Sequence, residues 1–113
     1  MYGLSERSYE ELIQILDSVP EIEEAFIYGS RARGDYDNAS DIDISLSGEK
    51  LTKRSLRMLN DKLYDSHIPY FFDTHIFADI RNPKFKANVL RDGRLLYKRR
   101  NDRSLNRNKN FYK

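Results

Sequence analysis

The chain has 113 residues, enough for one modest hydrophobic core, and carries 20 Lys and Arg against 18 Asp and Glu. It contains no cysteine, which excludes a disulfide scaffold and a thiolate metal site and is compatible with a reducing cytoplasm. No apolar run approaches the roughly 20 residues of a membrane span, and the first residues do not resemble a signal peptide. We therefore expect a cytoplasmic protein that does not enter a membrane.

Charge is divided unevenly along the chain. Residues 1–97 hold 13 basic and 17 acidic side chains, whereas residues 98–113 hold 7 basic and 1 acidic. This division predicts one folded domain over 1–97 and a basic, disordered tail over 98–113. The acidic body does not indicate a nucleic-acid-binding surface. The tail is either a solubilising end or an arm for RNA or an acidic partner.

The first predicted elements are a helix and a buried strand. Ser8 and Glu11 form a capping-box pattern, and Pro20 ends the helix. Apolar residues at helical spacing give the helix one hydrophobic stripe, formed by Leu12, Ile13, Leu16 and Val19. The apolar run AFIY at 25–28 predicts a central strand, and a short helix follows it.

The segment 41–47 alternates apolar and polar residues, a pattern typical of a strand with one buried face. The two predicted faces carry Ile42, Ile44 and Leu46 on one side, and Asp41, Asp43 and Ser45 on the other. Leucines at helical spacing then predict a helix capped by Thr52, with the stripe Leu56, Leu59 and Leu63.

Two further elements complete the predicted domain. Residues 68–77 are rich in aromatic and β-branched side chains and predict a third strand. Asn82 and Pro83 begin a last helix that ends at Gly93, and residues 94–97 either add a strand or pack against the sheet. The order of elements predicts a mixed α/β fold, a small mixed sheet flanked by helices.

Asp41 and Asp43 are the first candidates for chemistry. Two residues apart in a strand, their side chains project from the same face and repel each other unless a cation lies between them. Hard carboxylate oxygens suit Mg²⁺, which completes its coordination with water and substrate phosphate. A solvated polar face of an exposed strand is the alternative that the alternation alone leaves open.

Gly29 and Ser30 follow the first strand and favour the functional interpretation. A glycine at a strand end lets the backbone approach a ligand closely, and free amides at a helix start bind anions. Arg31 and Arg33 add guanidinium groups suited to phosphate oxygens, although an ordinary turn with solvated arginines has the same residues. A Walker-type phosphate loop is excluded, because Asp35 stands where its lysine belongs.

The spacing of these residues resembles a known signature. Gly29-Ser30, then ten residues, then Asp41-x-Asp43 is similar to the motif of the DNA polymerase β-type nucleotidyltransferase superfamily. The residues around this motif are most similar to those of the minimal nucleotidyltransferase (MNT) branch, and the resemblance extends over residues 10–98. It implies that the Gly-Ser pair holds the terminal phosphates of a nucleoside triphosphate, with support from Arg31 and Arg33.

The resemblance also implies a catalytic site with two Mg²⁺ ions. Asp41, Asp43 and a third carboxylate on a following strand would bind them, and Asp73 is the candidate for the third. Asp73 lies among apolar residues in the sequence, where an unpaired acid needs a cation or a donor. An acid at the sheet edge is the alternative. His75 shares the parity of Asp73 and is expected to be a packed or edge residue, and His67 is expected in a loop.

For the MNT branch, the resemblance implies an antitoxin that transfers AMP from ATP to a tyrosine of a HEPN-type ribonuclease toxin. Two other functions stay open. One is a module that blocks a toxin by binding alone, with an idle site. The other is a nucleotidyltransferase that acts on a small molecule or an RNA end, which the basic tail favours and the acidic body disfavours.

Overall fold

The structure is a computed structural model that describes residues 1–100. Its elements are α1 (Glu6–Asp17), β1 (Glu24–Tyr28), α2 (Gly29–Arg33), β2 (Ile42–Ser47), α3 (Lys53–Tyr64), β3 (Phe72–Ile76), the 3₁₀ turn η1 (Phe77–Asp79), α4 (Pro83–Asp92) and β4 (Arg94–Lys98). This order confirms the predicted mixed α/β fold, including the short strand after the last helix.

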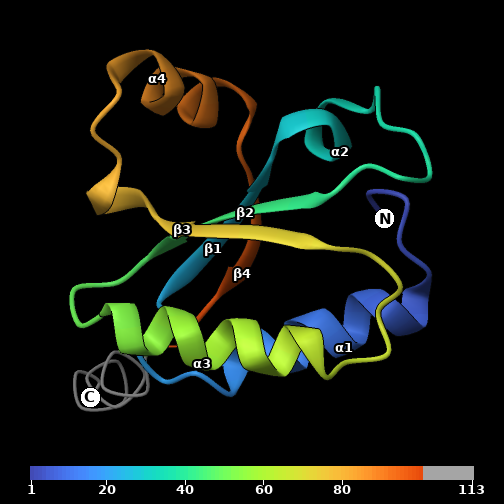
Figure 1. The fold of residues 1–113 in the computed structure, drawn as a ribbon, viewed down its shortest axis with the longest axis horizontal. Helices are drawn as coiled ribbons and strands as arrows, with labels where there is room; N and C mark the ends of the chain where they lie inside the picture. Colours follow the sequence, from blue (N-terminus) through green and yellow to red (C-terminus); the bar gives the residue numbers. More distant parts are fainter. Residues whose placement is uncertain (101–113) are drawn as a thin grey trace, which may run out of the picture.

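The four strands form one mixed sheet in the order β3-β2-β1-β4 (Figure 1). β1 is antiparallel to both β2 and β4, while β2 and β3 are parallel and are joined through α3. Helices α1 and α3 lie together along one side of the sheet, and α2 and α4 lie beyond its opposite end (Figure 1). Phe85 of α4 contacts Tyr28 of β1 and His75 of β3, so α4 packs against part of the sheet face opposite to the core.

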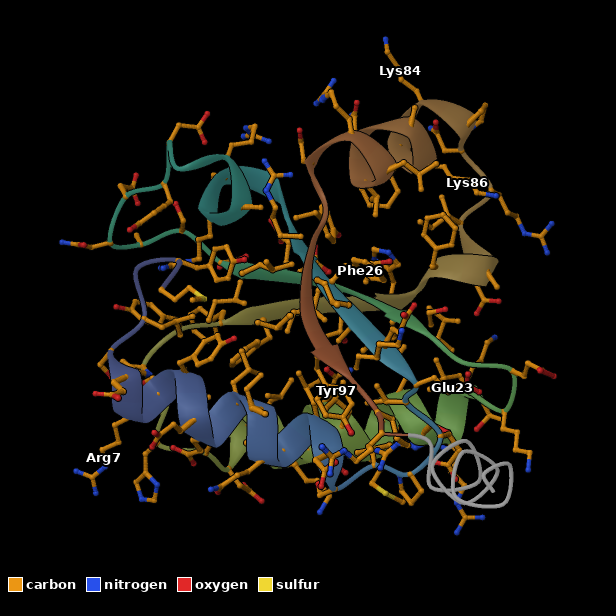
Figure 2. All side chains as sticks on the ribbon, turned by 180° about the vertical axis from the view of Figure 1, so that it is seen from behind. Arg7, Glu23, Phe26, Lys84, Lys86 and Tyr97 are labelled. Atoms are coloured by element: carbon orange, nitrogen blue, oxygen red, sulfur yellow. The ribbon has the colours of Figure 1, made fainter. Side chains whose placement is uncertain are left out.

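The hydrophobic core lies between the sheet and helices α1 and α3. Every second residue of β2 enters it, and these side chains have no exposed surface, namely Ile42, Ile44 and Leu46. Leu12 and Leu16 of α1 and Leu59 of α3 are equally buried. Tyr97 of β4 also points toward α1 and donates to Asp17 Oδ1 at 2.6 Å (Figure 2).

Helix α1 begins three residues earlier than the sequence pattern predicts. Ser5 is the N-cap and accepts from the Ser8 amide at 3.1 Å, so Ser8 lies inside the first turn. Glu11 therefore does not close a capping box, and its carboxylate accepts from the His67 amide at 3.1 Å. The prediction was wrong because Ser5 offers the same cap one turn earlier.

The caps of α3 and α4 are those predicted. Thr52 and Ser55 form a reciprocal capping box at α3. The Asn82 side chain accepts from two amides of the first turn of α4, and Pro83 occupies the first helical position. The exposed Lys84 of α4 points away from the sheet (Figure 2), whereas Lys86 Nζ lies 5.2 Å from the centre of the Phe77 ring in η1.

Two boundaries differ from prediction. The third strand begins at Phe72 rather than residue 68, because Ile68 turns into the core instead of pairing in the sheet. Lys98 ends β4, and Arg99 donates to three backbone carbonyls around the end of α1, so these two residues of the predicted tail belong to the fold. Residues 101–113 of that predicted tail lie outside the described residues. Within residues 1–100, no helix is long and apolar enough to cross a membrane.

Candidate active site

The alternation of β2 separates the core from a polar sheet face. Asp43 and Ser45 of β2 lie on the face opposite to Ile42 and Ile44, as the sequence predicted. Asp41, which is exposed, comes just before this strand. The candidate site is built on this polar face, near the end of the sheet where α2 and α4 lie.

Asp43 and Asp73 are opposite each other in the parallel ladder between β2 and β3. Side chains at the same level of neighbouring strands, about 4.8 Å apart, project from the same face. The structure thus brings together two carboxylates that are 30 positions apart in the chain. Asp73 is exposed on the edge strand, so the expectation that apolar residues enclose it was wrong, although its predicted position beside Asp43 is the one observed.

The electrostatics show that these acids interact. Partial burial, together with the negative charges of Asp73 and Asp41, raises the pKa of Asp43 to about 6. Arg33 and Arg31 oppose this effect only in part. The fold therefore holds a carboxylate where its ionised form is unfavourable without a cation.

Gly29 is required at the end of β1 for two physical reasons. Its φ is +75°, a left-handed conformation that other residues adopt at a cost. A Cβ atom at this position would also collide with the Asp43 carboxylate. The backbone at Gly29 and the Asp43 carboxylate are therefore in direct proximity, which joins the predicted phosphate site to the predicted metal site.

Ser30 lies in the first turn of α2, directly after Gly29. Tyr28, the residue before this helix, makes no capping hydrogen bond with its side chain. The first amides of α2 and the Ser30 hydroxyl are thus free of a side-chain cap, and such groups bind anionic oxygens. The Gly29-Ser30 turn has the chemistry of a phosphate-binding site.

The acidic side chains also have the donor chemistry for Mg²⁺. Carboxylate oxygens are its preferred protein ligands, and a divalent cation would relieve the repulsion that raises the pKa of Asp43. Among residues 1–100, no three Asp, Glu or His side chains are gathered as closely as a preformed metal site requires. Substrate phosphate and water would therefore supply the remaining ligands of an ion held by Asp43 and Asp73, with Asp41 nearby.

The comparison with protein families agrees with this geometry. Residues 10–102 match the model described as polymerase beta, nucleotidyltransferase. The chain belongs to the polymerase β nucleotidyltransferase family. No curated protein sequence matches it.

Solved structures of this nucleotidyltransferase fold are similar over most of both chains. A chain of a toxin–antitoxin complex with AMP-PNP is 21% identical, covers 86% of this chain and 78% of its own, and has a TM-score of 0.66. A chain of the complex between the tri-AMPylated Shewanella oneidensis HEPN toxin and its MNT antitoxin is 18% identical, with 94% and 82% covered and a TM-score of 0.61. A nucleotidyltransferase-like protein of Sulfolobus solfataricus is 25% identical, with 82% of each chain covered and a TM-score of 0.51.

Arg31 of this nucleotidyltransferase has a structural position that its sequence did not indicate. It is 2% exposed, and its guanidinium lies 4.3 Å from the centre of the Tyr70 ring. Its Nε donates to the Ser40 carbonyl at 3.0 Å and its Nη1 to the Tyr2 carbonyl at 2.9 Å. Through these two hydrogen bonds the enclosed guanidinium ties the N-terminal segment to the loop before β2, while Arg31 Nη2 is buried without a hydrogen-bond partner among the described residues. The role of Arg31 as a support for the triphosphate stays a prediction.

Arg33 is exposed and paired with acids, one of which the sequence analysis did not single out. Its guanidinium contacts Asp35 and Asp92, each at 3.2 Å. Asp92 ends α4, is mostly buried, and also accepts from Arg91, which lowers the pKa of Asp92 to about 2, with Arg33 acting in the same direction. This pair connects α2 to α4; the sequence gives no local signal for a contact across 59 positions.

A hydrogen-bonded aromatic cluster lies next to the acids. His75 Nε2 and Ser45 Oγ are 2.9 Å apart, and His75 Nδ1 and Tyr28 Oη are 3.3 Å apart. Burial lowers the pKa of His75, and the charge of Asp73 opposes this shift. His75 is therefore a packed residue on the site face, as expected, whereas His67 is exposed and lies 3.5 Å from Glu11.

Proposed function

We propose that this protein is a Mg²⁺-dependent nucleotidyltransferase that transfers AMP from ATP to a tyrosine hydroxyl of a HEPN-type ribonuclease toxin, and thereby acts as its antitoxin. The observation that carries the proposal is the meeting of Asp43, Asp73 and the Gly29 turn at one end of the sheet. Membership of the nucleotidyltransferase family supports the reaction class. The fold shared with chains of toxin–antitoxin complexes supports the kind of partner.

Each part of the site has a role in this reaction. The Gly29-Ser30 turn binds the terminal phosphates through amides and a hydroxyl, and Arg33 adds positive charge beside it. Asp41, Asp43 and Asp73 would hold the two Mg²⁺ ions, which when bound stabilise charge on the transferring phosphoryl group and the leaving pyrophosphate. Asp73 is exposed on the edge strand and accepts the proton of the acceptor hydroxyl.

The acidic set also bears on the alternative of a module that only binds. A carboxylate with a raised pKa lowers the stability of the folded state at neutral pH. A protein whose site is idle gains nothing from three neighbouring acids at this cost. The placement of Asp43 beside Asp73 on one face therefore favours an active site over an idle one.

The test is incubation of the protein with ATP labelled at the α-phosphate, Mg²⁺ and the HEPN-type protein of the neighbouring gene. We expect label on the toxin with the wild type and at least a hundredfold less with Asp43→Asn or Asp73→Asn, the loss typical of removing a charged group at a reacting centre. Asp61→Asn on α3, an exposed acid outside the site, is the matched control and should keep full labelling.

Three outcomes separate the functions. Label on the toxin that disappears with Asp43→Asn supports the proposal. Neutralisation of the toxin that survives Asp43→Asn and Asp73→Asn contradicts it and identifies a binding antitoxin. Label on an added RNA end or small acceptor, with none on the toxin, contradicts the assigned acceptor but keeps the nucleotidyltransferase reaction.

A further inference from the structure

A pocket of about 330 Å³ opens directly beside Asp73, between β3, the η1 turn and the start of α4. Its walls combine aromatic and charged side chains, including Tyr28, Asp73, His75, Asp79, Arg81 and Phe85. Figure 1 shows η1 and α4 on one side of the sheet end and α2 on the other. The pocket therefore adjoins both Asp73 and the end of β1 before the phosphate-binding turn.

Three rings make the inner wall of this pocket. Tyr28, His75 and Phe85 contact one another with ring centroids 5.4 to 5.9 Å apart and tilted or edge-to-face planes. The hydrogen bonds of His75 to Ser45 and Tyr28 hold its ring in place. Phe85 is 38% exposed, so part of its ring remains free to contact another ring in the favourable edge-to-face geometry.

The geometry of phosphoryl transfer determines what a pocket beside Asp73 can bind. The attacking and leaving oxygens lie on opposite sides of the phosphorus atom, roughly in line. If the terminal phosphates are held at the Gly29-Ser30 turn, the attacking hydroxyl must approach the α-phosphorus from the side opposite to them. Asp73, which lines the pocket, is the carboxylate proposed to accept the proton of that hydroxyl, so the pocket adjoins the position from which the hydroxyl attacks.

We propose that this pocket binds the phenol ring of the acceptor tyrosine, with its hydroxyl directed toward Asp73. The inference rests on the proposed transfer of AMP to a tyrosine. The volume is large enough for a phenol ring, and the aromatic wall offers this ring edge-to-face contacts. Asp79 and Arg81 line the pocket and are exposed, so both are accessible to the chain that carries the tyrosine, whereas the side chain of Asn82 is engaged in capping α4.

The reaction at this site is the transfer of AMP from ATP to the tyrosine oxygen. The tyrosine oxygen forms a bond to the α-phosphorus of ATP, and the bond from that phosphorus to the bridging oxygen of the β-phosphate breaks. Pyrophosphate carries away the bonding pair, and the phenolic proton passes to the Asp73 carboxylate. The products are the AMP-tyrosine ester and pyrophosphate.

The first test compares kinetic constants for the two substrates. Phe85→Ala removes one wall of the pocket at a partly exposed position, and we expect the KM for the toxin to rise roughly tenfold while the KM for ATP stays unchanged. Arg81→Glu at the rim of the pocket should also raise the KM for the toxin. Leu90→Ala is the control, because Leu90 is on the same helix, is 66% exposed and does not line the pocket.

The second test measures binding without transfer. The protein is titrated with N-acetyl-tyrosinamide in the presence of Mg²⁺ and α,β-methylene-ATP, which cannot donate AMP, and NMR resonances of His75 and Phe85 are followed. We expect these resonances to shift with the tyrosine compound and not with N-acetyl-serinamide. Phe85→Ala should abolish most of the shift at His75.

The outcomes are distinct. A Phe85→Ala variant that changes only the KM for ATP, or neither constant, overturns the assignment of the pocket. If the wild type labels no toxin, the proposed function fails, and the NMR titration decides the pocket alone: shifts at His75 and Phe85 support a phenol site. No shift, or an equal shift with the serine compound, overturns it.

Discussion

Replacing Asp43 by asparagine should stabilise the protein in the absence of metal while it abolishes transfer. The folded state raises the pKa of this carboxyl from 3.8 to about 6, and each pKa unit corresponds to about 1.4 kcal/mol. Asparagine has the same shape without the charge. The upper bound of the gain at neutral pH is therefore about 3 kcal/mol, and the partial exposure of the side chain reduces it to roughly 1–3 kcal/mol.

The pH dependence follows from the sign of the shift. Because the pKa is higher in the folded state, the folded protein binds more protons than the unfolded chain between pH 3.8 and about 6. The stability associated with Asp43 is fully present below pH 3.8 and is lost as the pH rises through 6. The difference between Asp43→Asn and the wild type should be near zero at pH 3.5 and reach its maximum above pH 7.

The assay is thermal and urea unfolding of both proteins in chelator between pH 3.5 and 8. For a domain of this size, 1 kcal/mol corresponds to about 4–8 °C in melting temperature. Asp61→Asn, an exposed acid on α3, should show no such pH-dependent gain. An Asp43→Asn variant that is equal to or less stable than the wild type at pH 8 would refute the conclusion that the acids repel one another in the fold.

Three further predictions use the same unfolding measurements or NMR. Gly29→Ala should cost more stability than Gly34→Ala, because both glycines have positive φ, each costing about 1–2 kcal/mol, but only a Cβ at Gly29 meets another group; equal losses would contradict the close approach of the Asp43 carboxylate. Arg31→Met should lower the free energy of unfolding by about 2–4 kcal/mol, because the carbonyls of Tyr2 and Ser40, which are partly buried, lose their donor, and a loss below 1 kcal/mol in urea would show that the guanidinium is not structural. The stability supplied by ionised Asp92 should be present above its unfolded pKa and be lost as the pH falls toward 2, with its own carboxyl carbon titrating near pH 2 in NMR spectra; titration near 4 would contradict its pairing with Arg91 and Arg33.

Much of the candidate site was predictable because its signals are local. The period of two in residues 41–47 is a property of the strand itself, so Asp43 had to face away from Ile42 and Ile44. The turn at Gly29 follows from the conformational freedom of glycine at a strand end. The caps Thr52 and Asn82 act on amides two or three residues away, which a linear pattern contains in full.

Other features depended on segments far apart in the chain. The exposure of Asp73 depends on β3 being an edge strand, and the burial of Arg31 depends on Tyr2, Tyr36 and Tyr70 enclosing it. The sequence shows that residue 73 is an aspartate and residue 31 an arginine. It does not show which side chains surround them in the fold.

The sequence by itself determined the elements, the polar face of β2 and the residue types of a phosphate and metal site, because these depend on neighbours within one or two turns. Only the tertiary structure decided the register that places Asp43 opposite Asp73 and the ion pair between Arg33 and Asp92. Strand register and helix docking are selected by the packing of the whole core, since a shift of one residue would turn the buried face of β2 to solvent. That selection is made jointly by residues that no local pattern connects.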